Sequence, residues 1–187
     1  MKKVVKFVLQ SVALALCVAF MSSCSETEEV SRYDNWQERN ESFIDSLANV
    51  YDSKLDPELM AVTNEYDKNS PKIYFKKEIK QTEGITPQFN DSIEVFYLGV
   101  TILGDKFDGN FDGKEVQIND KPEGFALNKV IPGWNWALQH VREGERVKLY
   151  IPWQSGYGSK GSTMVPGYST LIFTVQVEKV IKKDKYK

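Results

Sequence analysis

The feature that most constrains the fold is a change in the spacing of apolar residues at about residue 71. Beyond it, apolar and polar residues alternate in several short segments, which are 73–79, 92–98, 146–151 and 171–178. Alternation with a period of two is typical of strands with one buried and one solvent-exposed face. Turn-forming residues separate these segments. The second half of the chain is therefore predicted to form an antiparallel sheet.

One short helix, predicted over residues 134–141, interrupts these strands. Its apolar positions fall at i, i+3, i+4 and i+7, which are Trp134, Ala137, Leu138 and Val141. The turn Val130-Ile131-Pro132-Gly133 places Trp134 in the first helical turn, where a large aromatic side chain can form the floor of a cavity. Several half-exposed strands and one helix predict an α+β domain over residues 71–187, with a groove between its two layers.

The first 23 residues have the layout of a signal peptide. A lysine-rich start precedes an apolar run over residues 7–21, which Gln10 and Ser11 interrupt. This run is shorter than the roughly 18 apolar residues expected of a membrane span. The segment Met21-Ser22-Ser23-Cys24 resembles a bacterial lipobox, in which the cysteine is acylated and becomes the first mature residue. Lipidation at Cys24 would anchor the protein to a membrane, since each buried methylene contributes about 0.8 kcal/mol.

An acidic tether is predicted over residues 24–30. Its sequence, Ser25-Glu26-Thr27-Glu28-Glu29, fits a solvated linker. It also resembles the acidic tract that follows the lipidated cysteine in surface-exported lipoproteins of Bacteroidetes. The protein is therefore expected in the cell envelope, on the periplasmic or the surface face of the outer membrane.

A helical segment is predicted over residues 31–70. No proline or glycine occurs from 31 to 54, and a helical stripe contains Trp36, Phe43, Ile44, Leu47 and Tyr51. Asp56-Pro57 is expected to end this helix, and a second short helix is predicted over 58–64. Such a stripe packs either on the parent domain or on a partner helix. The favoured alternative is a dimer or docking role, in which residues 31–70 would form the contact of a homodimer.

The composition excludes several classes of function. Both cysteines lie within the first 24 residues, so the folded part has no disulfide and no cysteine metal site. The single histidine, His140, is expected to be a surface or capping residue. Removing Lys2, Lys3 and Lys6 leaves 24 − 3 = 21 basic against 26 acidic residues, which is unlike a nucleic-acid binder. We expect no metal and no cofactor.

Seven short motifs follow one another along the strand-rich half of the chain. They are Val95–Gly99, Lys106–Gly109, Phe125–Trp134, Arg142–Arg146, Ile151-Pro152, Gly156–Gly158, and Val165-Pro166 leading to Ser169–Phe173. Each motif alone is weak evidence. Their shared order and spacing over about residues 71–181 resemble the FKBP family of peptidyl-prolyl cis-trans isomerases.

This resemblance implies a five-stranded antiparallel sheet half-wrapped around one short helix, with an apolar pocket that binds a proline ring. It implies that Tyr97, Asp108 and Tyr157 are catalytic. The implied substrate contacts are Phe107, Phe125, Val130, Ile131, Trp134, Met164, Val165 and Phe173. Phe125 could be a pocket wall or the neighbouring core position. Gly167 stands where the family commonly has a second proline, which leaves open how rigid the loop is.

The implied function is a peptidyl-prolyl isomerase that assists the folding of exported proteins and takes proline-containing polypeptides as partners. Rotation about an X-Pro bond has a barrier of about 18–20 kcal/mol but breaks no covalent bond, so no nucleophile, metal or cofactor is required. One alternative is a non-catalytic peptide-binding or chaperone module that uses the same pocket. Another is a surface adhesion protein that keeps the fold only as a scaffold.

Overall fold

The computed structural model describes residues 31–64 and 70–183. The predicted signal peptide over 1–23, the lipidation site Cys24 and the tether over 24–30 lie outside the described residues and stay predictions. The chain divides into two compact units, 1–34 and 35–187, and the helices and strands discussed below belong to the second. In the described part of the first unit, the Ser31 N–H donates to the Asp34 carboxylate at 2.8 Å.

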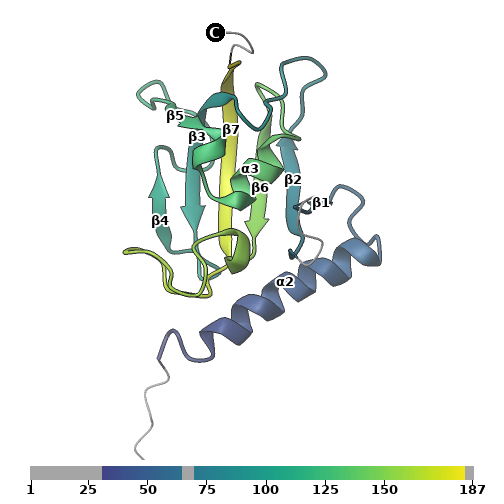
Figure 1. The fold of residues 1–187 in the computed structure, drawn as a ribbon, viewed down its shortest axis with the longest axis vertical. Coiled ribbons are helices and arrows are strands. Elements are labelled where there is room, and N and C mark those ends of the chain that lie inside the picture. Colours follow the sequence, from purple (N-terminus) through teal and green to yellow (C-terminus); the bar gives the residue numbers. More distant parts are fainter. Residues whose placement is uncertain (1–30, 65–69, 184–187) are drawn as a thin grey trace, which may run out of the picture. The chain divides into compact units, whose positions relative to one another are not determined.

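The second unit is built on one antiparallel sheet (Figure 1). Its strands are β1 Met60–Val62, β2 Ile73–Ile79, β3 Ser92–Val100, β4 Lys106–Gly109, β5 Glu123–Ala126, β6 Arg146–Ile151 and β7 Leu171–Ile181. The order across the sheet is β1-β2-β6-β7-β3-β4, and β5 also pairs with β3. The four strands predicted from alternation are confirmed. The sheet has seven strands instead of the predicted five, because segments of three or four residues, too short to show alternation, also pair.

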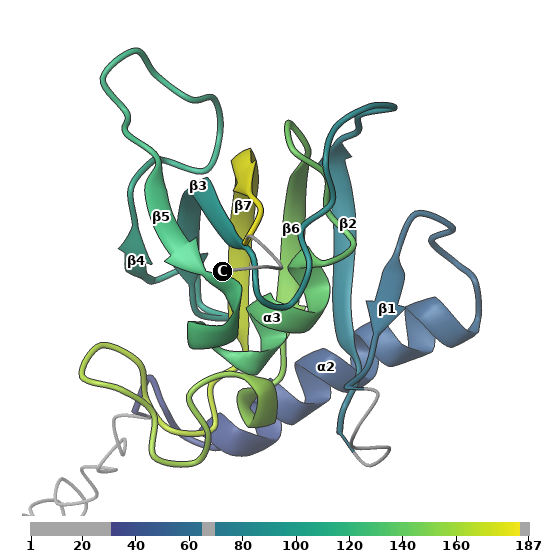
Figure 2. The same cartoon turned by 45° about the horizontal axis from the view of Figure 1, so that its top comes forward.

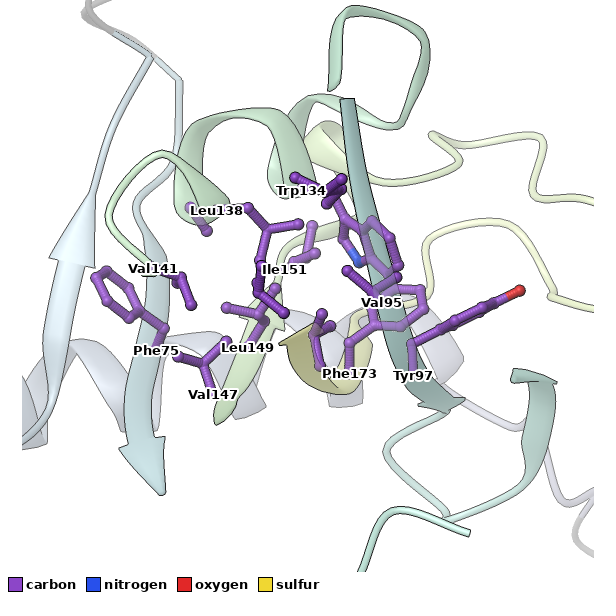
Figure 3. Close-up of a cluster of buried hydrophobic side chains, with 14 of the residues drawn as sticks. Phe75, Val95, Tyr97, Trp134, Leu138, Val141, Val147, Leu149, Ile151 and Phe173 are labelled. Atoms are coloured by element: carbon purple, nitrogen blue, oxygen red, sulfur yellow. The ribbon is translucent and has the colours of Figure 1, made fainter. Parts of the chain in front are cut away.

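Helices contact the two opposite faces of this sheet (Figure 2). Those two helices are α2 Trp36–Asp52 and α3 Pro132–Leu138, and the described residues also include the short 3-10 helices η1 Leu127–Lys129 and η2 Trp153–Ser155. The hydrophobic core lies between α3 and the sheet, where Trp134 and Leu138 pack on inward side chains of the strands (Figure 3). The α+β prediction is confirmed. Within the described residues, no helix combines the length and the apolar character needed to cross a membrane.

The helix α2 packs on the face of the sheet opposite to α3. Phe43 lies 6.0 Å from Tyr150, and Tyr51 meets the edge of Tyr74 at 5.9 Å, measured between ring centroids. Trp36, at the start of α2, is buried. The apolar stripe therefore packs on its own domain, which was one of the two alternatives. The homodimer through residues 31–70 stays a prediction.

The prediction of a second helix over 58–64 is wrong, because Met60–Val62 forms the strand β1 and pairs with β2. The residues there do not prevent a helix, but the free edge of β2 offers hydrogen-bonding partners that a local helix cannot supply. Ion pairs hold the segment beside β2, since Lys76 lies 2.9 Å from Asp56 and 3.3 Å from Glu58. Tertiary pairing therefore decides the structure of this segment.

The turn after α3 is held by a buried carboxylate. Glu145 is 2% exposed, and it accepts hydrogen bonds from the Arg142 N–H at 2.8 Å and the Lys77 ammonium at 2.6 Å. Burial alone would raise the pKa of Glu145, but these donors outweigh it and leave the pKa below its usual value. The helix itself ends at Leu138, earlier than predicted, although Val141 is still buried in the core.

The insertion between β4 and β5 covers the outer face of the sheet. Phe111 is buried there and its ring lies 6.3 Å from Phe96. The Asn110 side chain makes hydrogen bonds to the β3 backbone that a neighbouring strand would otherwise make. It accepts from the Tyr97 N–H at 2.7 Å and donates to the Val95 carbonyl at 3.0 Å. Ile118, farther along the insertion, is 99% exposed. Phe111 thus anchors the insertion away from the pocket described next.

Candidate functional site

An apolar pocket of about 270 Å³ lies between α3 and the sheet. It is lined by Tyr97, Asp108, Phe125, Lys129, Val130, Ile131, Trp134, Tyr157 and Phe173. These residues come from β3, β4, β5, β7, η1, α3 and the loops beside them. The volume is slightly below that of pockets for drug-sized ligands, so the space suits one small ring or side chain.

The pocket floor is Trp134, in the first turn of α3. Pro132 begins the helix with its φ already near the helical value, and the Ile131 carbonyl accepts from the Trp134 N–H at 3.1 Å. Gly133 allows α3 to approach β6 closely, because a Cβ there would lie 2.3 Å from the Ile151 Cγ2. The Pro-Gly pair therefore sets both the start of the helix and its depth in the domain.

Three aromatic rings stand edge-to-face around the indole of Trp134. Tyr97, Phe125 and Phe173 lie at centroid distances of 5.4, 5.5 and 5.1 Å, with interplanar angles of 89°, 81° and 75°. This arrangement is favoured by the ring quadrupoles and fixes the floor. The indole Nε1 is buried and has no hydrogen-bond partner among the described residues. The indole is therefore held by packing alone. Phe125, one of the three rings, lines the pocket and is a wall residue.

A polar edge borders this apolar pocket. The Tyr97 hydroxyl lies 3.1 Å from Asp108 Oδ1 and 3.2 Å from Glu123 Oε2, so it can donate to either carboxylate. Asp108 is itself fixed by the Gly109 N–H, which donates to it at 2.8 Å. Figure 3 shows the Tyr97 ring in the buried cluster and its hydroxyl pointing away from it. The two carboxylates thus orient the wall ring from its polar end.

Both tyrosines of the pocket are held in the protonated form. Burial, reinforced by the nearby negative charge of Asp108, raises the pKa of Tyr97 and that of Tyr157 above the usual 10.0. Among the described residues, none exchanges a hydrogen bond with the Tyr157 hydroxyl. At neutral pH this hydroxyl is therefore a hydrogen-bond donor that a ligand can use.

The structure brings most of the predicted site residues together, with three exceptions. Phe107 lies behind the wall, where its ring contacts Phe173 at 5.4 Å and Tyr157 at 6.3 Å. Val165 is 2% exposed and belongs to the hydrophobic core, whereas Met164 beside it is 66% exposed and does not line the pocket. Neither residue of the loop tip contacts the pocket interior.

Two residues at the pocket were not predicted from the sequence. Lys129 lines it, directly before the Val130-Ile131 wall. Glu123 is two residues before Phe125 on β5, so both side chains lie on the face that meets Tyr97. Side chains two residues apart in a strand lie on the same face, so the placement of Phe125 in the pocket wall could have indicated that Glu123 also faces Tyr97.

Comparisons with known proteins agree with this geometry. A family model described as FKBP-type peptidyl-prolyl cis-trans isomerase matches residues 83–178. The FKBP-type peptidyl-prolyl cis-trans isomerase FkpA of Escherichia coli K12 is 34% identical over 99 residues, which is 53% of this chain and 34% of that protein. The macrophage infectivity potentiator of Trypanosoma cruzi is 40% identical over 92 residues, covering 49% and 44% of the two chains. The chain thus spans about a third to a half of the length of these relatives.

Solved structures share the fold. A peptidyl-prolyl cis-trans isomerase from Pseudomonas syringae pv. tomato has a TM-score of 0.62 and 23% identity, covering 80% of this chain and 96% of that one. The crystal structure of FkpA from Escherichia coli has a TM-score of 0.56 and 23% identity, with coverage of 97% and 73%. The sheet wrapped around one short helix is therefore an architecture that this chain has in common with those two proteins.

Proposed function

The chain belongs to the family of FKBP-type peptidyl-prolyl cis-trans isomerases, and we propose that it catalyses the rotation of X-Pro bonds in exported polypeptides. The observation that carries this proposal is the pocket itself. Trp134 forms an apolar floor enclosed by three aromatic rings, and hydrogen-bond donors lie at its edge. That combination suits a proline ring whose neighbouring carbonyl groups stay near polar atoms.

The proposed mechanism lowers the barrier without covalent chemistry. The planar X-Pro amide is polar and well solvated, whereas the twisted amide has lost its conjugation. A pocket that removes water from the amide therefore favours the twisted form over both planar forms. Trp134 and Phe173 hold the proline ring in place, so the residue before proline rotates about the amide bond while the ring stays fixed.

The polar groups orient the peptide on either side of the proline. The Ile131 backbone is fixed at the start of α3, and its N–H is proposed to donate to a substrate carbonyl. The Tyr157 hydroxyl is proposed to donate to a second carbonyl. Asp108 positions the Tyr97 ring through the phenol and transfers no proton, because the raised pKa of Tyr97 keeps that proton in place.

Exchange spectroscopy on a short X-Pro peptide tests the activity. We expect wild type to accelerate cis-trans exchange equally at pH 7 and pH 9, since the raised pKa values keep Tyr97 and Tyr157 protonated throughout.

Asp108→Asn weakens the hydrogen bond that orients the Tyr97 ring and should lower kcat/KM by about twofold to fivefold. The loss is smaller than that of a whole hydrogen bond, because Glu123 still accepts from the Tyr97 hydroxyl. The exposed carboxylate Asp112 provides the control Asp112→Asn, which should match wild type. Folded wild type without any acceleration would disprove the proposal.

For the amino-terminal segment we propose a signal peptide over 1–23 and a lipid anchor on Cys24, which would hold the domain at the outer membrane. The support is the order of lysines, apolar run, small residues and cysteine in the sequence. The domain would then act on proline-containing polypeptides within the cell envelope. Its similarity to FKBP-type relatives concerns the domain alone.

Acyl labelling in the cell of origin tests the anchor. Wild type should incorporate a labelled fatty acid and sediment with membranes, because acyl chains on one cysteine give stable anchoring. Cys24→Ser should lose both properties. The other cysteine supplies the control, since Cys17→Ser should keep the label if Cys17 is removed with the signal peptide. Label that persists in Cys24→Ser would refute the site.

A further inference from the structure

The loop between η2 and β7, residues 156–170, is called the flap here. It carries Tyr157 at the pocket and leads directly into β7, which carries the wall residue Phe173. The flap is tightly closed on itself, since the Tyr168 N–H donates to the Gly158 carbonyl at 3.0 Å. Its base, at Ser169 and Thr170, therefore lies in the chain between the two lining residues Tyr157 and Phe173.

The helix α2 contacts this base through Trp36. The indole Nε1 donates to the Ser169 hydroxyl at 2.9 Å, and that hydroxyl donates onward to the Pro166 carbonyl at 2.6 Å. Both Trp36 and Ser169 are buried. A side chain of α2 is thus linked by two consecutive hydrogen bonds to the backbone of the flap.

Asn40 forms a second link, one turn farther along α2. Its side chain is 0% exposed, and Oδ1 accepts from the Thr170 N–H at 2.7 Å while Nδ2 donates to the Trp36 carbonyl at 2.7 Å. The Thr170 hydroxyl also donates to the Asn40 carbonyl at 3.2 Å. Asparagine is a poor residue for a helix interior, and a buried amide is costly unless its hydrogen bonds are made. These contacts to the flap base provide the reason for an asparagine here.

A third contact joins α2 to the segment that precedes the flap. The Trp153 indole N–H, in η2, donates to the Glu41 carboxylate at 3.3 Å. The same indole packs against the Tyr168 ring at 5.0 Å and 73°. Tyr168 is held with φ at +61°, an unfavourable conformation for a bulky residue that surrounding contacts must maintain. At the other end of the flap, the Gly156 and Gly158 N–H groups donate to the Trp153 carbonyl at 3.1 and 2.8 Å, so both ends contact α2 or a residue that α2 holds.

We infer that α2 holds the flap in its binding position, and that Trp36 and Asn40 are positioning residues which set the affinity of the pocket for X-Pro peptides. This inference rests on the proposed isomerase function. The helix lies outside residues 83–178, the part matched by the family model, so the isomerase domain is supplemented by a helix of this chain. The helix reaches the pocket through its hydrogen bonds to Ser169 and Thr170 at the flap base.

Full-length variants of α2 test this inference by amide hydrogen exchange and by steady-state kinetics. Asn40→Ala should speed exchange of the Tyr168 amide at least about tenfold, because local opening of the flap becomes easier. The KM for an X-Pro peptide should rise about fivefold, equivalent to one lost hydrogen bond, with kcat changed less than about twofold. Trp36→Phe keeps most of the ring packing but removes the N–H, and should give a smaller change in the same direction.

The matched control is Tyr51→Ala at the other end of α2, where the ring contacts Tyr74 and not the flap. It should lower the free energy of unfolding but leave Tyr168 exchange and KM as in wild type. Equal effects of Asn40→Ala and Tyr51→Ala, compared at matched stability, would overturn the inference. Flap exchange that stays unchanged in Asn40→Ala and Trp36→Phe would also overturn it. Hydrogen exchange of the Tyr168 amide needs no catalysis, and the Kd of an X-Pro peptide from a binding titration can replace KM. An inactive wild type would therefore refute the proposed function and leave this measurement decisive.

Discussion

Replacing Trp134 with alanine should lower kcat/KM for an X-Pro peptide by about 30-fold to 150-fold, because burial of an apolar side chain contributes about 2–3 kcal/mol. The indole is the floor of the pocket and is held by three edge-to-face rings. Without it, water enters the pocket and the proline ring has no surface to rest on. The measurement is exchange spectroscopy, below the unfolding temperature of each variant.

Two companion variants separate loss of the floor from loss of the fold, since removing a buried tryptophan also destabilises a domain by about 3–5 kcal/mol. Trp134→Phe keeps an aromatic floor and loses an N–H that is unpaired among the described residues, so it should stay within about threefold of wild type. Trp136→Ala removes a half-buried indole from the same helix outside the pocket lining, and should reduce activity little. A loss in Trp136→Ala as large as that in Trp134→Ala would contradict the assignment.

Gly167→Ala should distort the flap and lower kcat/KM by about tenfold or more. A Cβ at this position would lie 2.0 Å from the Ser159 carbonyl oxygen, which is part of the backbone and cannot turn aside. Overpacking of this kind costs about 1–3 kcal/mol, and a displacement of about 1 Å near a binding site can reduce a rate by up to about 100-fold. Kinetics should be measured together with the free energy of unfolding.

Gly124 offers the matched control, because a Cβ built there meets nothing within 4 Å although it lies on β5 beside the pocket wall Phe125. Gly124→Ala should therefore keep near-wild-type activity. Normal kinetics in Gly167→Ala would mean that the flap does not need its close backbone contact. Gly167 is thus explained by close packing within the flap, and the absence of a second proline is not a sign of a loose loop.

The sequence predicts the parts of this fold that depend on local periodicity. The four long strands and the helix carrying Trp134 have clear patterns, and their apolar faces meet in the core as expected. The strand β1 could not be predicted, because its three residues acquire their structure from the edge of β2. The same limit applies to α2, whose stripe indicated a buried face but not which surface covers it.

The candidate site was predictable where a residue is fixed by a motif on a regular element. Trp134, Tyr97 and Phe173 are examples, since each has a defined direction on α3, β3 or β7. Loop residues differ, because neighbours such as Met164 and Val165 can point in opposite directions without any period to distinguish them. The carboxylate of Glu123 becomes recognisable only when β5 is aligned with β3.

The side chain of Asn110 has a consequence for how this domain tolerates change. By completing the hydrogen bonds of β3 between β4 and β5, and by donating to the Lys121 carbonyl at 3.0 Å, it closes both ends of the insertion on the sheet. The Lys114 carbonyl is still bound by the Arg146 guanidinium of β6. Residues 115–120 lie beyond these contacts, and doubling the length of a flexible loop costs only about 0.6 kcal/mol. This stretch is therefore a suitable place to graft a foreign peptide or reporter while keeping the pocket over Trp134 intact.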